Sequence, residues 1–103
     1  MKTISSQRYI DESTVESKIE NQDFTVFVSP AFEIDGEKVR VVLDGHHSLQ
    51  AAKQAGVDAD FVEQDATDND TIGLLNDGDI DGFLVAAHMG DDYYDTDTGA
   101  DIW

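Results

Sequence analysis

The stretch VRVVLDGHHSLQAAKQAG, residues 39–56, decides the fold of this 103-residue chain. Residues 39–43 are mostly β-branched or apolar and predict a strand that runs into the core. The Asp-Gly pair at 44–45 interrupts this pattern. Residues 48–55 are good helix formers, and Gly56 is placed to end the helix. The stretch therefore predicts a strand, a glycine turn and a helix in direct succession.

The turn between this strand and this helix has the features of an anion site. The first amides of a helix have no partner within the helix and lie at the positive end of its dipole. A glycine at this point lets a phosphate approach the backbone. The predicted nucleotide- or phosphate-binding residues are Asp44, Gly45, His46, His47 and Ser48.

Two interpretations remain open for the histidines of this turn. Imidazole can donate to a phosphate or act as a general acid or base near neutral pH. Alternatively, His47 bonds to the backbone to stabilise the turn, and His46 is simply exposed. Asp44 is expected to accept a hydrogen bond in the turn rather than to act as a base, and no residue is assigned as catalytic.

Other segments predict a hairpin before this stretch and short elements after it. Residues 24–28 and 31–34 read as strands, and the turn signal Asp35-Gly36 leads into a return strand over residues 38–43. A short helix around Ile10, Val15 and Ile19 is expected, with Asp11 or Ser13 as its cap. Further predictions are a strand over 57–63, a helix over 69–75 capped by Asp68, and a helix over 80–89 capped by Asp79.

These elements define one domain over residues 1–103, because the chain is too short for a second core. We expect an α+β fold with a short mixed sheet and helices packed on it. Residues 22–63 form its strand–turn–helix core, and residues 64–103 form an acidic part that is first helical and then rich in Tyr and Asp. Whether the last ten residues are ordered is left open.

Residues 22–63 resemble the ParB/sulfiredoxin-like superfamily, whose members carry a strand that ends in DGHHR, followed by LxAAKxxG. The resemblance implies a small α+β domain with a nucleotide or phosphate pocket, used for nucleotide-dependent clamping, phosphoryl transfer or nuclease activity. This chain has Ser48 where the family has its phosphate-binding Arg, and His46 where a sulfiredoxin has Cys. The matching positions are Asp44, Gly45, His46, His47, Leu49, Ala51, Ala52, Lys53 and Gly56.

The charge of the chain is strongly negative and unevenly spread. Six Lys and Arg stand against 23 Asp and Glu, giving a net charge of −17. A magnitude of about 2–8 is ample for the solubility of a small domain. The N-terminal half (residues 1–53) holds all six basic and nine acidic residues, whereas the C-terminal half (residues 54–103) holds fourteen acidic and no basic ones.

This composition excludes several functions. Direct binding to nucleic acid or to an anionic membrane surface requires clustered Lys and Arg. The absence of Cys excludes disulfides and thiolate chemistry. Residues 77–82 match the opening of a calcium loop, but the twelfth position, which should hold Glu, is His88, so we expect no metal. No segment resembles a signal peptide or a membrane span, and a cytoplasmic protein is expected.

Three hypotheses address the acidic half. In the first, its carboxylates imitate nucleic acid and occupy the basic groove of a DNA- or RNA-handling protein, as an inhibitor carried by a phage or plasmid would. In the second, the chain is a nucleotide-binding enzyme or switch of the family that it resembles, and its charge is incidental. No cofactor is expected for the chain, and nucleotide is the one possible exception under this second hypothesis. In the third, the charge is an adaptation to high salt, although such adaptation should acidify both halves. We favour the first, with an interaction surface of Asp68, Asp70, Asp77, Asp79, Asp81, Asp91, Asp92, Asp95 and Asp97.

Aromatic residues near the C-terminus also admit two interpretations. Tyr93, Tyr94 and Trp103 are of the types enriched at binding hot spots. Equally, they could cover the core or the edge of the sheet.

Overall fold

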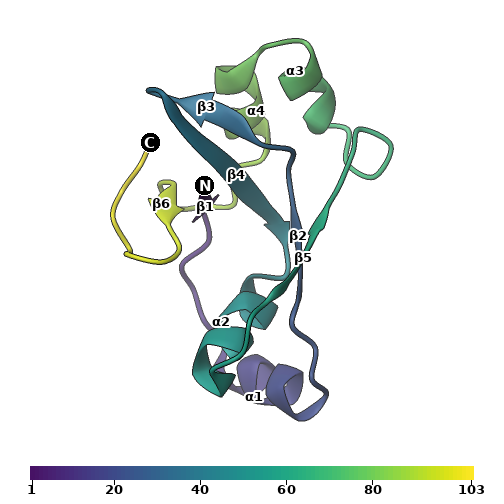
Figure 1. Ribbon diagram of the computed structural model, residues 1–103, viewed down its shortest axis with the longest axis vertical. Coiled ribbons are helices and arrows are strands. Elements are labelled where there is room, and N and C mark those ends of the chain that lie inside the picture. Colours follow the sequence, from purple (N-terminus) through teal and green to yellow (C-terminus); the bar gives the residue numbers. More distant parts are fainter.

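The computed structural model describes residues 1–103 as a six-stranded mixed sheet with four helices, so the predicted α+β class is confirmed. The strand order is β5-β2-β4-β1-β6, and β3 pairs with β4 (Figure 1). The elements along the chain are β1 (Lys2–Ser5), α1 (Glu12–Glu20), β2 (Thr25–Val28), β3 (Phe32–Ile34), β4 (Glu37–Asp44), α2 (His46–Ala55), β5 (Asp60–Glu63), α3 (Ile72–Asn76), α4 (Ile80–Ala86) and β6 (Tyr94–Asp95).

Strand β4 is the centre of the fold and contributes to a core on each face of the sheet. It pairs in parallel with β1 and antiparallel with β2 and β3. Because successive side chains of a strand point to opposite faces, its odd residues enter one core and Val42 enters the other. The larger core contains Ile4, Val39, Val41, Leu43, Ile72, Phe83, Leu84, Ala87 and Tyr93, and the smaller one Val26, Val28, Val42 and Leu49.

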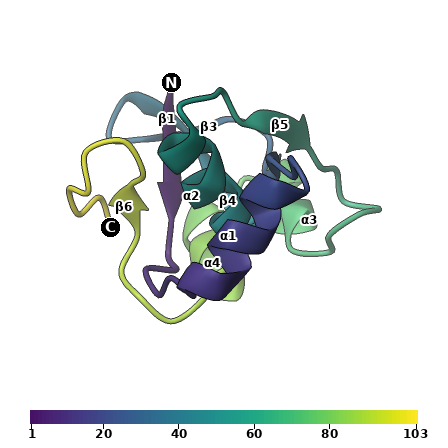
Figure 2. The same ribbon diagram turned by 90° about the horizontal axis from the view of Figure 1, so that it is seen from below.

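Two pairs of helices cover these cores. Helices α3 and α4 supply Ile72, Phe83 and Leu84 to the larger core, and α2 supplies Leu49 to the smaller one. Helix α1 packs on α2. The pairs lie at opposite ends of the long axis, so that α1 and α2 are nearest when the molecule is seen from below (Figure 2). None of the four helices, the longest of which has ten residues, has the length and hydrophobicity to cross a bilayer.

Several local predictions are confirmed. The hairpin of β3 and β4 turns at Asp35-Gly36, both with positive φ, as predicted. Asp11 caps α1 by accepting hydrogen bonds from the amides of Ser13 and Thr14. Asp79 caps α4 by accepting from the Gly82 amide at 2.9 Å.

Other local predictions are wrong. Helix α2 begins at His46 rather than at residue 48, because Gly45 takes the N-cap position. Asp68 caps no helix. The Asp65 carboxylate accepts from the amides of Thr67 and Asp68, so this segment forms turns, and α3 begins only at Ile72. Strand β1 was not expected at all. Strand β5 is shorter than predicted, and so are α3 and α4.

The C-terminal segment is folded onto the sheet. The Ile102 amide donates to the Tyr93 carbonyl at 2.8 Å, and Tyr94 forms a β-bridge with Asp101. Tyr93 is fully buried, and its hydroxyl donates to the Leu84 carbonyl at 2.7 Å. Tyr93 therefore belongs to the core, whereas Trp103 is 46% exposed.

Candidate functional site

The DGHHS turn (residues 44–48) packs tightly against strand β2. Gly45 has a φ of +94°, which favours glycine, and an added Cβ would lie 2.6 Å from the Thr25 carbonyl oxygen and 2.9 Å from the Val26 Cα. The close approach that Gly45 permits is therefore to the β2 backbone. A phosphate has no room on that side of the glycine.

Both histidines of the turn bind the segment that leads into α1. The Nε2 atom of His46 lies 3.1 Å from the Tyr9 carbonyl oxygen and donates to it, so this ring carries its proton on Nε2. His47 Nε2 accepts from the Asp11 amide at 3.1 Å, which leaves its proton on Nδ1. The expectation that His46 is exposed is wrong, since its exposed fraction is 8%. His47 does form a hydrogen bond with the backbone, as one of the two interpretations expected, but its partner is the Asp11 amide and not a group of its own turn.

The surroundings of His46 keep its imidazole neutral. Burial lowers the pKa of His46 most, and the neighbouring His47 lowers it further. The hydrogen bond to the Tyr9 carbonyl opposes them, and the effects of Lys53, which lowers the pKa, and of Asp91, which raises it, are smaller still. A neutral, buried and hydrogen-bonded imidazole is suited to hold a chain segment in place. It offers no positive charge to a phosphate at neutral pH.

A hollow of about 300 Å³ lies in front of the α2 N-terminus, where the anion site was predicted. Two carboxylates line it. Asp44 Oδ1 accepts from the Gly45 amide at 2.8 Å, as the predicted turn acceptor. Asp23 pairs with Lys18 at 2.8 Å, and the Lys18 ammonium lowers the pKa of Asp23, with a smaller contribution from the Thr25 amide. Ser48 is buried beside them. Lys18, the single cation of this hollow, is thus already paired with Asp23. The second carboxylate, Asp44, leaves the hollow with a net negative charge, which opposes a bound phosphate.

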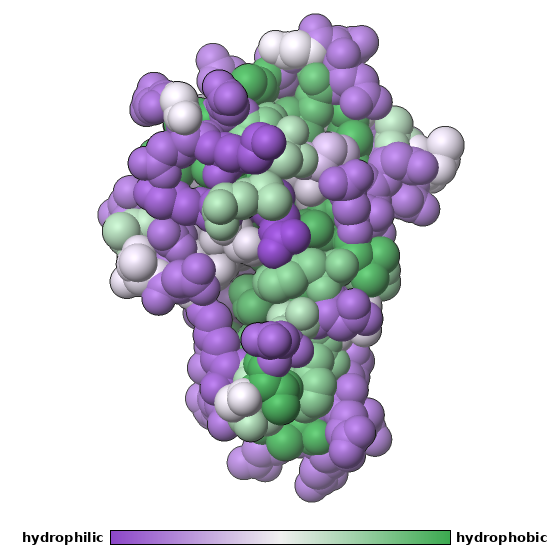
Figure 3. All heavy atoms as spheres, in the orientation of Figure 1, coloured by the Kyte–Doolittle hydropathy of each residue, from purple (hydrophilic) through white to green (hydrophobic).

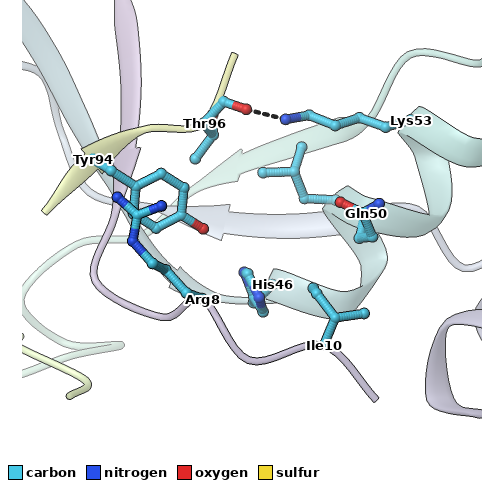
Figure 4. A pocket seen from close by; sticks show the side chains of 8 residues that line it. Arg8, Ile10, His46, Gln50, Lys53, Tyr94 and Thr96 are labelled. Atoms are coloured by element: carbon cyan, nitrogen blue, oxygen red, sulfur yellow. Dashed lines mark hydrogen bonds between the residues drawn. The ribbon is translucent and has the colours of Figure 1, made fainter. Parts of the chain in front are cut away.

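A second hollow, of about 150 Å³, lies between α2, the segment around Arg8 and the segment of Tyr94 and Thr96 (Figure 4). Arg8 stacks over the Tyr94 ring at 4.1 Å and pairs with Asp101 at 2.9 Å. The Lys53 ammonium donates to the Thr96 carbonyl. These cations therefore fasten the C-terminal segment to the rest of the fold. Nothing in the sequence indicates this juxtaposition, because Arg8 and Tyr94 are far apart in the chain and belong to no common motif.

Eight of the nine aspartates predicted for the acidic surface are exposed, and Asp95 is not. The exposed fraction of Asp95 is 6%, and its Oδ1 accepts from the Asp97 amide at 2.9 Å within the turn after β6. Asp95 therefore stabilises a turn, and its inclusion in the surface was wrong. A short-range Asp-to-amide bond of this kind is frequent in turns, but the sequence alone does not distinguish Asp95 from the exposed aspartates around it.

Most carboxylates have no cation beside them. The chain forms three ion pairs, Lys2–Glu37, Arg8–Asp101 and Lys18–Asp23, so 20 of the 23 acidic residues are unpaired. Arg40 is occupied with Thr3 and stacks over Phe61. In the C-terminal half, the acidic side chains with neither an ion pair nor a hydrogen bond are Asp58, Asp60, Glu63, Asp70, Asp77, Asp81, Asp92 and Asp97.

This charge lies on an elongated body. The principal extents are 40 × 29 × 23 Å, so 17 net negative charges along 40 Å correspond to about one per 2.4 Å. Duplex DNA carries about one per 1.7 Å of axis. Hydrophilic residues ring the outline of the molecule in Figure 3, and hydrophobic atoms are visible along the middle of that face. Counted along the long axis, the net charge per ångström is about 0.7 of that of duplex DNA, and it is spread around a cross-section of 29 × 23 Å.

No group of three or more His, Asp or Glu side chains is arranged to hold a metal ion. In the calcium-like stretch, Asp79 is used as the cap of α4. Comparisons of the chain with protein-family models, with curated proteins and with solved structures gave no match. The resemblance of residues 22–63 to the ParB/sulfiredoxin-like superfamily therefore remains a prediction based on the motif.

Proposed function

We propose that this protein binds a basic nucleic-acid-handling protein and occupies the groove in which that partner holds DNA or RNA. The observation that carries the proposal is the density of unpaired carboxylates along the 40 Å body. Complementary fields of this kind give fast association that weakens with salt. On this proposal the chain is a binding protein and an inhibitor, as expected of a phage- or plasmid-borne factor, and no catalytic residue is needed.

The carboxylates of the C-terminal half are proposed to make the contacts. Eight of them bond to nothing within the chain, so they are available without loss of an internal interaction. The cations, by contrast, are largely engaged within the fold: Arg8 and Lys53 fasten the C-terminal segment, and Lys18 pairs with Asp23. No basic cluster is left to bind nucleic acid directly.

The experiment is capture of partners from a host lysate at about 0.05 M and about 0.5 M NaCl, where the Debye length falls from roughly 14 Å to roughly 4 Å. The proposal expects a captured protein that is retained only at low salt, that binds DNA or RNA when isolated, and that releases a labelled oligonucleotide when the chain is added. A partner that keeps its oligonucleotide in the presence of excess chain contradicts the proposal.

The nucleotide-binding alternative uses the DGHHS turn and predicts measurable binding of ATP or CTP that His47→Ala abolishes. The carboxylates of Asp23 and Asp44 in front of α2, and the packing of Gly45 on β2, speak against it. Calorimetric titration of the chain with ATP and CTP decides between the two. Saturable binding lost in His47→Ala favours the alternative, and the absence of heat favours the acidic binding protein.

A further inference from the structure

A groove of about 390 Å³ separates the β3–β4 hairpin from α4 and the C-terminus. Its volume lies within the range of sites that accommodate a ligand or an anchoring side chain. Four of its lining residues are hydrophobic, and the other three are acidic. The lining consists of Glu33, Ile34, Asp35, Ile80, Asp81, Leu84 and Trp103.

The apolar part of the groove is packed against the larger core. Leu84 is fully buried and forms part of the larger core. The Trp103 ring packs on Tyr93, with 5.9 Å between ring centroids, and the Tyr93 hydroxyl is bonded to the Leu84 carbonyl. Trp103 nevertheless remains 46% exposed. A preorganised Trp beside an apolar depression is typical of the central part of a protein interface.

The polar part of the groove carries one sign of charge. Glu33, Asp35 and Asp81 are exposed, and none of them forms an ion pair or a side-chain hydrogen bond. No Lys or Arg of the chain lines the groove. Three unpaired carboxylates around an apolar depression complement an apolar side chain that is flanked by cations.

We propose that this groove binds a short basic segment of a partner protein, in which one apolar side chain seats against Ile34, Ile80 and Trp103 while flanking Lys or Arg residues meet the three carboxylates. This inference rests on the proposed function, because it takes the partner to be basic. It adds a specific anchor to an otherwise long-range attraction. The carboxylates draw basic proteins to the chain, and the groove selects among them for an apolar residue in the basic segment.

The test uses Trp103, the single Trp of the chain, as a fluorescent reporter in the full-length protein. The probes are two synthetic peptides, KRKLKRK and KRKSKRK, which have equal charge and differ only in the central residue. At about 50 mM NaCl, the leucine peptide is expected to change the Trp103 emission and to bind about tenfold or more tightly than the serine peptide, because it buries an apolar side chain. Equal affinities, or an emission that neither peptide changes, overturn the proposal.

Two variants with equal loss of charge locate the binding. The groove variant Glu33→Gln, Asp35→Asn, Asp81→Asn is expected to weaken the leucine peptide about tenfold. The α1 variant Glu12→Gln, Glu16→Gln, Glu20→Gln removes the same three charges at a site remote from the groove, and is expected to weaken it less than about threefold. Equal weakening by the two variants overturns the proposal, since it would mean that net charge alone attracts the peptide.

The same variants separate this inference from the proposed function. If the groove variant captures and inhibits the nucleic-acid-binding partner as well as the α1 variant does, the groove proposal fails while the proposed function stands. If the groove variant loses a partner that does not bind nucleic acid, the groove proposal stands and the proposed function fails.

Discussion

The N-terminal half bonds its distinctive polar side chains to its own backbone, whereas the C-terminal half leaves most of its carboxylates in solvent without a partner. His46, His47 and Asp44 all bond to backbone groups of the fold. In the C-terminal half, eight carboxylates bond to nothing in the chain. The DGHHS motif, which is the clearest motif of the sequence, therefore makes hydrogen bonds within the fold. The exposed carboxylates available to a partner come mainly from residues outside this motif. The contrast also shows that a high net charge can coexist with a well-packed sheet, because the unpaired charges stay exposed.

The largest expected loss of stability comes from a substitution that disrupts the close packing of the DGHHS turn on β2. Gly45→Ala should lower the free energy of unfolding by about 3 kcal/mol, since it combines an unfavourable φ with a clash against the β2 backbone. Gly56→Ala is the matched control: its φ is also positive, +70°, but an added Cβ meets nothing within 4 Å, so about 1 kcal/mol is expected. Urea denaturation measures both, and equal losses would show that the turn is not packed as described.

His46 should contribute the next largest effect. His46→Ala removes a buried ring and its part-buried hydrogen bond to the Tyr9 carbonyl, at a cost of about 2 kcal/mol at pH 7.5. The exposed His88 serves as the control, and His88→Ala should cost less than about 0.5 kcal/mol. Similar losses in the two variants would mean that His46 does not tie the Tyr9 segment to α2.

The pH dependence gives an independent check on His46. Because burial lowers its folded-state pKa below the ordinary value of 6.5, the unfolded chain binds the proton more readily. Stability should therefore be fully present above pH 6.5 and decline as the pH falls below it toward the lower folded-state pKa. His46→Ala should lose less stability over that interval than the parent chain. Unfolding curves at pH 7.5, 6.5 and 5.5 measure this, and parallel declines in both proteins would contradict it.

Within the acidic half, a carboxylate that caps a helix should contribute to stability, whereas an exposed carboxylate without a partner should not. Asp79→Ala removes the cap of α4 and is expected to cost about 1 kcal/mol. Asp92→Ala removes an exposed carboxylate without a partner and should leave stability unchanged or slightly raised. Thermal unfolding of the two variants gives the comparison. If Asp92→Ala cost as much as Asp79→Ala, the division between structural and available carboxylates would be wrong.

The smallest effect concerns salt. Repulsion among unpaired carboxylates should be screened as NaCl rises to about 0.2 M, where the Debye length is below 10 Å, and the melting temperature should rise by about 3–5 °C. Above that concentration it should stay flat. A melting temperature that continues to rise into multimolar salt would instead support adaptation to a saline environment as the reason for the charge.

The sequence predicted the elements whose signals are local. The hairpin follows from Asp35-Gly36 between β-rich runs, and the cap of α1 follows from Asp11 before a polar helix. Strand β1 escaped prediction because Ile4 is its one hydrophobic residue and its pairing with β4 is long-range. The helix start at His46 was missed because glycine is a weaker N-cap signal than Ser or Asp.

The candidate sites were predicted in part. The acidic surface could be read from composition, since exposed carboxylates are the rule, and Asp95 differs because its turn bond depends on the local fold. The position of the two imidazoles could not be predicted from the sequence. Their partners at residues 9 and 11 are more than 30 residues away in the chain and meet them only through tertiary packing. The groove at Trp103 was equally hidden, because it is built from a hairpin, a helix and the chain terminus.

The most direct test of the account compares two charge-matched variants in displacement of nucleic acid. A labelled oligonucleotide is bound to the partner captured at low salt, and the chain is added in increasing amounts. The C-terminal variant Asp70→Asn, Asp92→Asn, Asp97→Asn should require about tenfold more protein for half displacement than the parent chain. The α1 variant Glu12→Gln, Glu16→Gln, Glu20→Gln should behave like the parent chain. Displacement curves that coincide for the two variants, or an oligonucleotide that stays bound throughout, would contradict a nucleic-acid-like surface in the C-terminal half.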